Sequence, residues 1–419
     1  MRNVIRETNW AGNYTYRAST IHRPASIDEL RSIVAGAARI HALGTRHTFN
    51  DMADAPELVS LERLDPGIAV DREAMTVSVG AAVRYGIFAE ALERKGFALH
   101  NMGSLPHISV GGATATGTHG SGDRNRNLSS AVCGIELVTS DGAMVHVNRG
   151  DPDFDGMVVH LGALGVVTRL TLDIQPSYQA CQEVVEGLPW DDLTGDFDAI
   201  FSSAYSVSIF TSYAETADVL WLKHRLEPGQ EPTAINRWRA TAAIANRHPV
   251  ASLPAEFCTA QMLEPGPWCF RIPHFRLDQP PASDGEEIQT EYMVDRRHAV
   301  AVIEALRELE PQMRESLMIS EIRSIAADDL WLSTACGRDT VAFHFSWYKD
   351  QPKVDALLPV IEERLAEFDA RPHWGKAFAM GGDVLATRYP KFDDFRSLRR
   401  RLDRRDAFLT PYLERCGFT

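Results

Sequence analysis

The chain has 419 residues, of which 44% are hydrophobic and 24% are charged, and it carries a formal net charge of −14 at pH 7. Such a chain buries a large core and forms two domains or more, and its acidic balance gives no electrostatic reason to bind nucleic acid or anionic lipid. The six cysteines lack CxxC spacing, no apolar run reaches the roughly 18 residues of a membrane span, and the N-terminus has no apolar secretory segment, so we expect a cytoplasmic protein without a metal site.

The first 175 residues alternate between helical and extended patterns. Ser26 and Glu29 form the S-x-x-E capping box of a helix that begins there. Further along, the pattern predicts a helix at 85–96 and strands at 40–43, 75–79, 97–103, 133–139 and 143–150, with a Ser-Asp-Gly hairpin turn at 140–142. The segment 161–174 carries a Gly-x-x-Gly turn and then an alternating strand. This mixture of helices and strands indicates an α+β domain.

The pattern changes after about residue 175, where strands, turns and aromatic residues are mixed. A helix is predicted at 296–309, and alternating strands at 316–325 and 339–348. We therefore expect a second α+β domain built around an antiparallel sheet. The basic run RSLRRRLDRR at 396–405 is interpreted as a solvated helix face, because nearby aspartates dilute its charge.

A histidine stands in an unusual loop near the N-terminus, in the segment ALGTRHTFND at 42–51. His47 follows a predicted strand and the small residues Gly44 and Thr45. From these residues alone it could be a base, a metal ligand, a covalent attachment point or a loop histidine without chemistry. The absence of companion ligands in the pattern argues against metal.

A second segment, SVGGATATGTHGSG at 109–122, consists almost entirely of small residues. Small side chains let backbone N–H groups approach an anion. A P-loop needs Lys after its second Gly, where this chain has Thr118, and the spacing does not fit the GxGxxG of a Rossmann unit. Two interpretations stay open: a loop that holds a flavin pyrophosphate, and a tightly packed Gly/Ala loop.

Several motifs in order decide between them. They are TNWAGNYTY, GTRHTFND, NMGSLPHISVGGATATGTHGSG, AYSVSIFT, EIRSIAAD, GRDTVAFHFSW and RPHWGK, and together they span nearly the whole chain. With them the chain resembles the vanillyl-alcohol-oxidase-type flavoproteins. Within that family it is most similar to alditol (xylitol) oxidases, which neighbour the aldonolactone oxidases.

The resemblance implies a two-domain α+β flavoprotein. A PCMH-type FAD-binding domain would comprise residues 1–175, completed by about 377–419, and an antiparallel-sheet substrate (cap) domain would comprise 176–376. It also implies FAD joined covalently through His47 to the flavin 8α-methyl. The family usually has Gly or Ser where Arg46 stands, and the Arg46 charge can lie near the pyrophosphate.

The remaining cofactor contacts are implied by the resemblance alone. They are Gly44, Thr45, Arg46, Thr48, Phe49, Gly103, Ser104, Ser109, Gly112, Ala113, Thr114, Gly117, Thr118, His119, Gly120, Ser121, Gly122, Gly165 and Val166. Val166 would meet the adenine through its backbone. His119 would either contact the flavin or be a packed loop histidine. Gly103 would leave room for dioxygen near the flavin or merely serve a turn.

Two predicted strands carry polar side chains on one face each. Alternation puts Glu321 and Arg323 on one face of their strand, and likewise His344 and Ser346, with Phe343 and Phe345 opposite. From the residues alone this could be a solvated face with salt bridges. The resemblance implies an active site, in which Glu321 and His344 form the base pair. Arg323 and Lys376 would then bind hydroxyls and stabilise negative charge, and Ser104 and Ser346 would contact substrate, although Ser104 could instead be a helix cap.

The implied activity is oxidation of the terminal alcohol of an alditol such as xylitol or sorbitol to the aldose, with hydride passing to flavin N5 and dioxygen giving hydrogen peroxide. The alternatives are an aldonolactone oxidase or dehydrogenase, and a flavin-free binding protein with a degenerate site. We expect a monomer whose partners are a small polyol and dioxygen.

Overall fold

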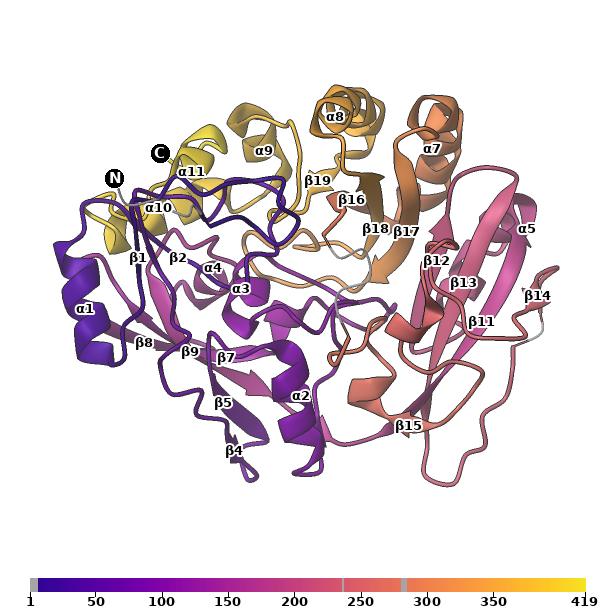
Figure 1. Ribbon diagram of the computed structural model, residues 1–419, viewed down its shortest axis with the longest axis horizontal. Helices are drawn as coiled ribbons and strands as arrows, with labels where there is room; N and C mark the ends of the chain where they lie inside the picture. Colours follow the sequence, from indigo (N-terminus) through magenta and orange to yellow (C-terminus); the bar gives the residue numbers. More distant parts are fainter. Residues whose placement is uncertain (1–6, 236, 280–284) are drawn as a thin grey trace.

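The computed structural model of the chain describes residues 7–235, 237–279 and 285–419. Two antiparallel sheets dominate the described part, one of five strands and one of nine (Figure 1). The five-stranded sheet lies in the N-terminal half of the chain, and the nine-stranded sheet lies beside it in Figure 1. The α+β class and the antiparallel second sheet that the sequence predicts are confirmed.

The N-terminal part begins with a small parallel sheet in the order β1-β3-β2. Its strands are β1 (Thr20–His22), β2 (Ile40–Ala42) and β3 (Glu57–Val59). Helix α1 (Ile27–Gly36) starts at the predicted capping box, because Ser26 Oγ accepts from the backbone N–H of Glu29 at 3.2 Å. Strand β2 ends two residues before Gly44, so it leads directly into the His47 loop.

The five-stranded sheet has the order β4-β5-β9-β7-β8. Its strands are β4 (Ala69–Asp71), β5 (Thr76–Gly80), β7 (Val132–Val138), β8 (Met144–Asn148) and β9 (Val166–Asp173). The helical segments in this part are α2 (Tyr85–Glu93), α3 (Val110–Ala115), η1 (Leu128–Ala131) and α4 (Phe154–Val158). The hairpin predicted at 140–142 is present, with Gly142 at φ +79°.

One strand in this part was predicted too long. Only β6 (Phe97–Ala98) of the segment 97–103 pairs, with β10 (Gln175–Pro176). Beyond it, the Asn101 side chain accepts from the backbone N–H of Met102 at 2.8 Å, which replaces a ladder bond. The chain then turns into the cavity described below.

The nine-stranded sheet has the order β14-β11-β13-β12-β17-β18-β16-β19, with β15 paired to β11. Its strands are β11 (Gln179–Pro189), β12 (Ser206–Thr211), β13 (Thr216–Leu226), β14 (Thr241–Ala242), β15 (Gly266–Pro267), β16 (Glu287–Asp295), β17 (Leu317–Ile325), β18 (Thr340–Tyr348) and β19 (Arg371–Pro372). The short helical segments are α5 (Trp190–Gly195), α6 (Phe197–Phe201), η2 (Ala255–Phe257), η3 (Trp268–Phe270), η4 (Arg296–His298) and η5 (Ala366–Phe368).

Two long helices pack beside the centre of this sheet, α7 (Ala299–Met313) and α8 (Gln351–Leu365) (Figure 1). Their buried side chains belong to one core cluster with Phe343 and Phe345 of β18. Burying this apolar face stabilises the fold by about 25 cal/mol per Å² of apolar surface. A one-residue slip of a strand would turn its apolar side chains to the other face, so this burial fixes the register of the strands. The opposite face is therefore the one left for polar chemistry.

The C-terminal helices return to the side of the molecule that carries the N-terminus (Figure 1). They are α9 (Gly382–Arg388), α10 (Phe392–Leu402) and α11 (Pro411–Arg415). The prediction of a solvated basic face was wrong for Arg399, whereas Arg405 is exposed. Arg399 is buried and pairs with Asp406 at 2.8 Å, and Arg405 donates to the backbone carbonyls of Ala35, Ala37 and Ser140. The Arg405 bonds fasten the C-terminal segment to the N-terminal part.

The small-residue loop is joined to the nine-stranded sheet. The Gly122 N–H donates to the Ser324 carbonyl at 2.9 Å, and the Ala326 N–H donates to the Asn125 carbonyl at 2.9 Å. Gly122 has φ +131°, and a Cβ there would lie 2.3 Å from the Tyr205 carbonyl oxygen, so no other residue fits. This junction brings the loop after α3 against the end of β17.

No helix in the described ranges is long and apolar enough to cross a membrane. The six cysteines are all free thiols. Among the residues that the structure describes, no group of three or more His, Cys, Asp or Glu side chains is arranged to hold a metal ion.

Candidate active site

One cavity runs from the His47 loop, past α3, to the polar face of the nine-stranded sheet. The predicted site residues that line it are Gly44, Thr45, Arg46, His47, Thr48, Phe49, Gly103, Ser104, Ser109, Gly112, Ala113, Thr118, His119, Gly165, Glu321, Arg323, His344, Ser346 and Lys376. The predicted cofactor contacts outside the lining are Thr114, Gly117, Gly120, Ser121, Gly122 and Val166. Two segments about 270 residues apart in the sequence thus share one cavity.

His47 is a half-buried histidine whose two ring nitrogens make no hydrogen bond. Both ring nitrogens are inaccessible to solvent and have no hydrogen-bond partner among the described residues. Burial, together with the positive charges of His107, Arg84 and Arg46, lowers the pKa of His47 to about 4, so its imidazole is neutral near pH 7. A neutral imidazole with an unpaired ring nitrogen is the nucleophilic form. Burying unpaired nitrogens costs free energy unless a partner fills the cavity beside them.

The N-terminal segment packs against the His47 loop. The Trp10 indole stacks on the His47 ring, with centroids 5.4 Å apart and planes 20° apart. The backbone N–H of Trp10 donates to the Arg46 carbonyl at 2.8 Å, and the Arg46 guanidinium pairs with Glu7. Arg46 has φ +64°, a left-handed conformation that explains why glycine would be favoured there.

Close packing joins the His47 loop to α3. Ser109 is the N-cap of this helix and accepts from the Gly112 N–H at 3.3 Å, while its own N–H donates to Thr45 Oγ1 at 3.1 Å. A Cβ on either Gly44 or Gly112 would lie 2.9 Å from Ser109 Oγ. The glycines therefore permit a close backbone approach, and they leave a concave wall.

The polar face of β17 and β18 supplies the other wall, as the alternation predicts. Glu321 pairs in register with His344, and Ile319 with Ser346. Phe343 and Phe345 point into the core on the opposite face. The solvated-face interpretation is excluded, because Glu321, Arg323, His344 and Ser346 are all at most 8% exposed.

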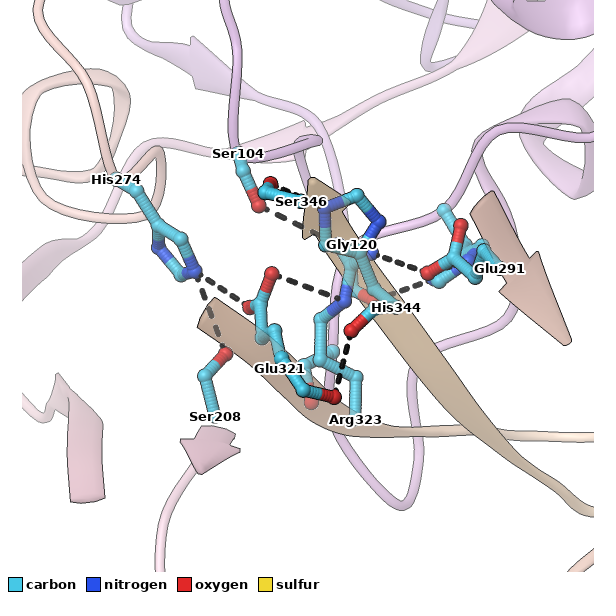
Figure 2. A network of polar contacts seen from close by, with 12 residues as sticks. Ser104, Gly120, Ser208, His274, Glu291, Glu321, Arg323, His344 and Ser346 are labelled. Atoms are coloured by element: carbon cyan, nitrogen blue, oxygen red, sulfur yellow. Dashed lines mark hydrogen bonds and ion pairs between the residues drawn. The ribbon is translucent and has the colours of Figure 1, made fainter. Parts of the chain in front are cut away.

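Arg323 lies at the centre of this face (Figure 2). Its guanidinium donates to Glu291 Oε1 at 2.5 Å and to Ser104 Oγ at 3.3 Å, and its Nε lies 3.5 Å from Glu321 Oε2. Glu291, from strand β16 on the far side of β18, also accepts from Lys376 Nζ at 2.7 Å. Burial raises the pKa of Glu291, but Lys376, His119 and Arg323 outweigh it and hold this pKa well below 4.5.

Lys376 connects Glu291 to His344. Its Nζ lies 2.6 Å from His344 Nδ1, and His344 Nε2 lies 3.2 Å from Ser346 Oγ. Burial lowers the pKa of Lys376, and Glu291 opposes that change. Burial and Lys376 also lower the pKa of His344 well below 6.5, so His344 is a neutral imidazole.

Glu321 is bound from its other side by His274 (Figure 2). His274 Nε2 lies 2.7 Å from Glu321 Oε1, and its Nδ1 lies 2.6 Å from Lys223 Nζ. Burial raises the pKa of Glu321, but Arg323 and His274 outweigh it, so the pKa lies below 4.5 and Glu321 is a carboxylate near pH 7. The backbone N–H groups of His274 and Phe275 both donate to the Ser104 carbonyl at 3.1 Å, which ties this segment to the cavity.

His119 connects the small-residue loop to this network. Its Nδ1 donates to the Gly120 carbonyl at 2.9 Å, and its Nε2 lies 3.3 Å from Glu291 Oε1. His119 is 3% exposed and lines the cavity. It is therefore both packed in its loop and directed at the polar face.

Three of these residues were missed in the sequence. Glu291 could have been found, because EIQTEYMVD alternates polar and apolar positions over β16. Lys223 follows the apolar run 219–222 of β13 and is followed by His224 and Arg225, so the sequence does not mark it as a buried charge. His274 lies in a loop outside the named strands and helices, and no local pattern marks it.

Comparisons with known proteins agree with this geometry. Residues 18–148 match the FAD binding domain family, and residues 286–416 match the D-arabinono-1,4-lactone oxidase family. Alditol oxidase of Streptomyces sp. (strain IKD472 / FERM P-14339) is 45% identical over 414 residues, which cover 97% of each chain. L-gulono-1,4-lactone dehydrogenase of Mycobacterium tuberculosis (strain H37Rv) is 28% identical, over 97% of this chain and 98% of that one.

Solved structures support the fold alone. A solvent-stable cholesterol oxidase superposes with a TM-score of 0.81 at 16% identity, covering 98% of this chain and 97% of that chain. Cholesterol oxidase from B. sterolicum superposes with a TM-score of 0.75 at 13% identity, covering 98% and 96%. The PCMH-type fold that the sequence implied is confirmed. The cavity wall formed by the His47 loop and α3 fits an FAD, because the His47 ring nitrogens are unpaired and glycines line the concave surface. The chain therefore belongs to the alditol oxidase family of FAD-dependent oxidoreductases, within the vanillyl-alcohol-oxidase-type flavoproteins and related to the aldonolactone oxidases.

Proposed function

We propose that this enzyme oxidises the terminal primary alcohol of an alditol to the aldose, with dioxygen reduced to hydrogen peroxide. The alcohol loses one hydride and one proton, and dioxygen takes up two electrons and two protons, so the reaction balances. FAD supplies the hydride acceptor at its N5 and passes the electrons to dioxygen. The observation that carries the proposal is the buried face of Glu321, Arg323, His344 and Lys376 in the cavity that His47 also lines.

A polyol needs both acceptors and donors, and this face holds them in fixed positions. Glu321 is a carboxylate and therefore only accepts, whereas Arg323 and Lys376 only donate. Ser104 and Ser346 can do either. These groups are already bonded to one another, so a chain of substrate hydroxyls can replace some of those bonds without leaving a buried polar atom unpaired.

Glu321 is the group we assign to receive the alcohol proton. Lys376 donates to Glu291 Oε2 and has further N–H groups, so it also donates to His344 Nδ1, and the single proton of this neutral ring must then lie on Nε2. His344 therefore acts as a donor to a substrate oxygen rather than as a base. This divides the pair that the resemblance implied, with Glu321 as acceptor and His344 as donor.

Arg323 and Lys376 supply positive charge where negative charge develops. Negative charge builds up on the alcohol oxygen as its proton leaves, and it passes to the acceptor as the hydride leaves the carbon. Two buried cations in fixed positions stabilise that charge without reorganisation. By the family resemblance, we place them toward the flavin N1–C2 carbonyl.

We further propose that FAD is attached covalently through His47. The support is the neutral, unpaired imidazole at the cavity wall and the Trp10 stack that holds its plane. The FAD-binding unit would comprise 1–175 with 377–419, and the substrate unit 176–376. The contacts of Arg405 with the carbonyls of Ala35, Ala37 and Ser140 support the assignment of the C-terminal segment to the first unit.

Gly103 supports dioxygen as the electron acceptor. A Cβ there would meet its neighbours at 3.7 Å or more, and the position does not have a positive φ, so the fold does not require glycine. Glycine at this cavity position keeps open a space that a side chain would fill.

An aldonolactone oxidase is the second candidate, because residues 286–416 match the D-arabinono-1,4-lactone oxidase family. Anaerobic stopped-flow mixing with xylitol, sorbitol and a 1,4-lactone separates the two. We expect flavin bleaching with the polyols and peroxide on admission of air. Bleaching by the lactone alone would overturn the alditol proposal, and colourless protein after purification would overturn both.

A further inference from the structure

The cavity continues past the polar face into an apolar end that the proposed proton and hydride transfers do not use. The side chains that line this end are Phe210, Val250, Leu253, Phe275 and Ile319. Phe210 pairs in register with Glu321, and Ile319 precedes Glu321 by two residues on β17. The apolar end therefore begins beside Glu321 and extends toward β12, on the side of β17 opposite β18.

His248 brings a polar atom to this apolar end. It belongs to the loop between β14 and η2, lines the cavity and is 6% exposed. Its ring centroid lies 5.6 Å from that of Phe275, and its Nδ1 lies 3.0 Å from the backbone nitrogen of Val250. Its Nε2 is buried and has no hydrogen-bond partner among the described residues. A buried, unpaired nitrogen costs free energy until a ligand pairs with it.

The loop is fastened so that His248 stays turned toward the cavity. Gln261 Oε1 accepts from the backbone N–H of Arg247 at 2.8 Å, and Gln261 Nε2 donates to the Arg247 carbonyl at 2.7 Å. Gln261 is itself 1% exposed, so these two bonds are shielded from water. The residues on both sides, 244–246 and 251–252, are exposed, so the loop turns its centre inward.

The chemistry of His248 selects the kind of group that can pair with it. Burial lowers the pKa of His248 to about 4, so the ring is neutral near pH 7. Its Nε2 either carries the one ring proton and donates, or is bare and accepts. A hydroxyl suits both cases, whereas a carboxylate or an ammonium group suits only one. The apolar walls beside it suit the C–H groups of a carbon chain.

We propose that His248 is a specificity-determining residue: its Nε2 binds a hydroxyl at the end of the polyol farthest from the reacting carbon, while the carbon chain lies against Phe210 and Ile319. Xylitol and sorbitol gain this bond. Pentane-1,2-diol, which has the chain length of xylitol but no far-end hydroxyl, does not. The inference deepens the proposed alditol oxidation and rests on it, with Glu321 receiving the proton of the reacting hydroxyl.

The test replaces His248 by the two amide side chains. An asparagine amide takes the place of Nδ1 and can keep the bond to the Val250 N–H, whereas a glutamine amide takes the place of Nε2. In His248→Asn we expect the xylitol concentration for half-maximal anaerobic flavin reduction to rise about tenfold, with the limiting rate within about twofold of the wild type. The same concentration for pentane-1,2-diol should change less than about twofold.

Two further variants are the controls. His248→Gln should stay within about threefold of the wild type with both substrates, because its amide still reaches the far-end hydroxyl. Ser252→Ala changes an exposed residue of the same loop outside the cavity lining, and it should match the wild type. If His248→Asn does not fold, His248→Phe, which keeps a ring beside Phe275, replaces it with the same expected result.

A packing role of His248 gives other results. Equal changes with xylitol and pentane-1,2-diol, no change with either, or a His248→Gln as impaired as His248→Asn would each overturn the inference while xylitol still reduces the wild-type flavin. Wild-type flavin that no polyol reduces overturns the proposed function, and this inference with it.

Discussion

Glu291→Gln tests how the buried charges of the active site are balanced. Glu291 is 1% exposed and accepts from Arg323 at 2.5 Å and from Lys376 at 2.7 Å. At an effective dielectric constant of about 20, two charges 2.7 Å apart attract by about 6 kcal/mol, which is an upper limit for one pair. Removing one partner of a buried ion pair costs about 3–5 kcal/mol, and because glutamine keeps an acceptor oxygen we expect a loss near 3 kcal/mol.

The pH dependence of this loss has a definite sign. The pKa of Glu291 lies well below 4.5 in the folded protein, so its stabilisation is present above about pH 4.5 and is lost as the pH falls through the folded-state pKa. The thermal midpoint of Glu291→Gln should therefore lie well below that of the wild type at pH 7. The gap should narrow as the pH falls below about 4.5.

The variant should also change catalysis. Without the Glu291 carboxylate, the pKa of Lys376, already lowered by burial, falls further, so less of the lysine is charged at pH 8 than at pH 6. We expect the limiting rate of anaerobic flavin reduction to drop as pH rises, with partial recovery at lower pH.

The control is Glu183→Gln. Glu183 is a buried glutamate on β11, outside the cavity lining, and it accepts from the Ile235 N–H at 2.9 and 3.0 Å. Glu183→Gln should lose stability without any change in the pH profile. If Glu291→Gln unfolds and turns over as the wild type does at every pH, the charge balance argued above is wrong.

The remaining predictions concern the residues proposed to hold the flavin or to leave room beside it (His47, Trp10 and Gly103) and the proton acceptor Glu321. His47→Ala should release all flavin on acid precipitation while still binding FAD reversibly; yellow precipitated protein would show another attachment site. Trp10→Ala should lower the fraction of covalently bound flavin, measured by in-gel fluorescence, whereas Trp10→Phe keeps a stacked ring and should retain most of it; equal retention by both would remove Trp10 from the attachment step. Gly103→Val should slow flavin reoxidation by air about tenfold or more and leave reduction by xylitol within about twofold, and Gly103→Ala should have a smaller effect; loss of reduction instead would mean that the side chain blocks substrate. Glu321→Gln should lower the limiting reduction rate by about 10²- to 10⁴-fold at unchanged flavin content, and a loss under tenfold would assign proton removal to another group.

Local sequence patterns predicted those parts of the protein that local physics controls. The capping box at Ser26 and Glu29, the hairpin turn at Gly142 and the strands β17 and β18 all depend on residues within a few positions of one another. The two-residue period also placed Glu321 and Arg323 on one face, and His344 and Ser346 likewise, because side chains alternate whatever the rest of the fold does. The family resemblance supplied the cofactor and His47, which no periodicity could give.

Only the tertiary structure decided which charges meet. Lys223 and His274 are 51 residues apart, His274 and Glu321 are 47 apart, and Glu291 and Lys376 are 85 apart. Their contacts depend on the strand order β13-β12-β17-β18-β16 and on a loop fastened to the Ser104 carbonyl. Strand order is set by the burial of the whole apolar face under α7 and α8, a sum over many distant residues. The sequence by itself therefore determined the type of each element and the presence of an acid and two cations, whereas the fold determined which of them is ionised, which donates and which accepts.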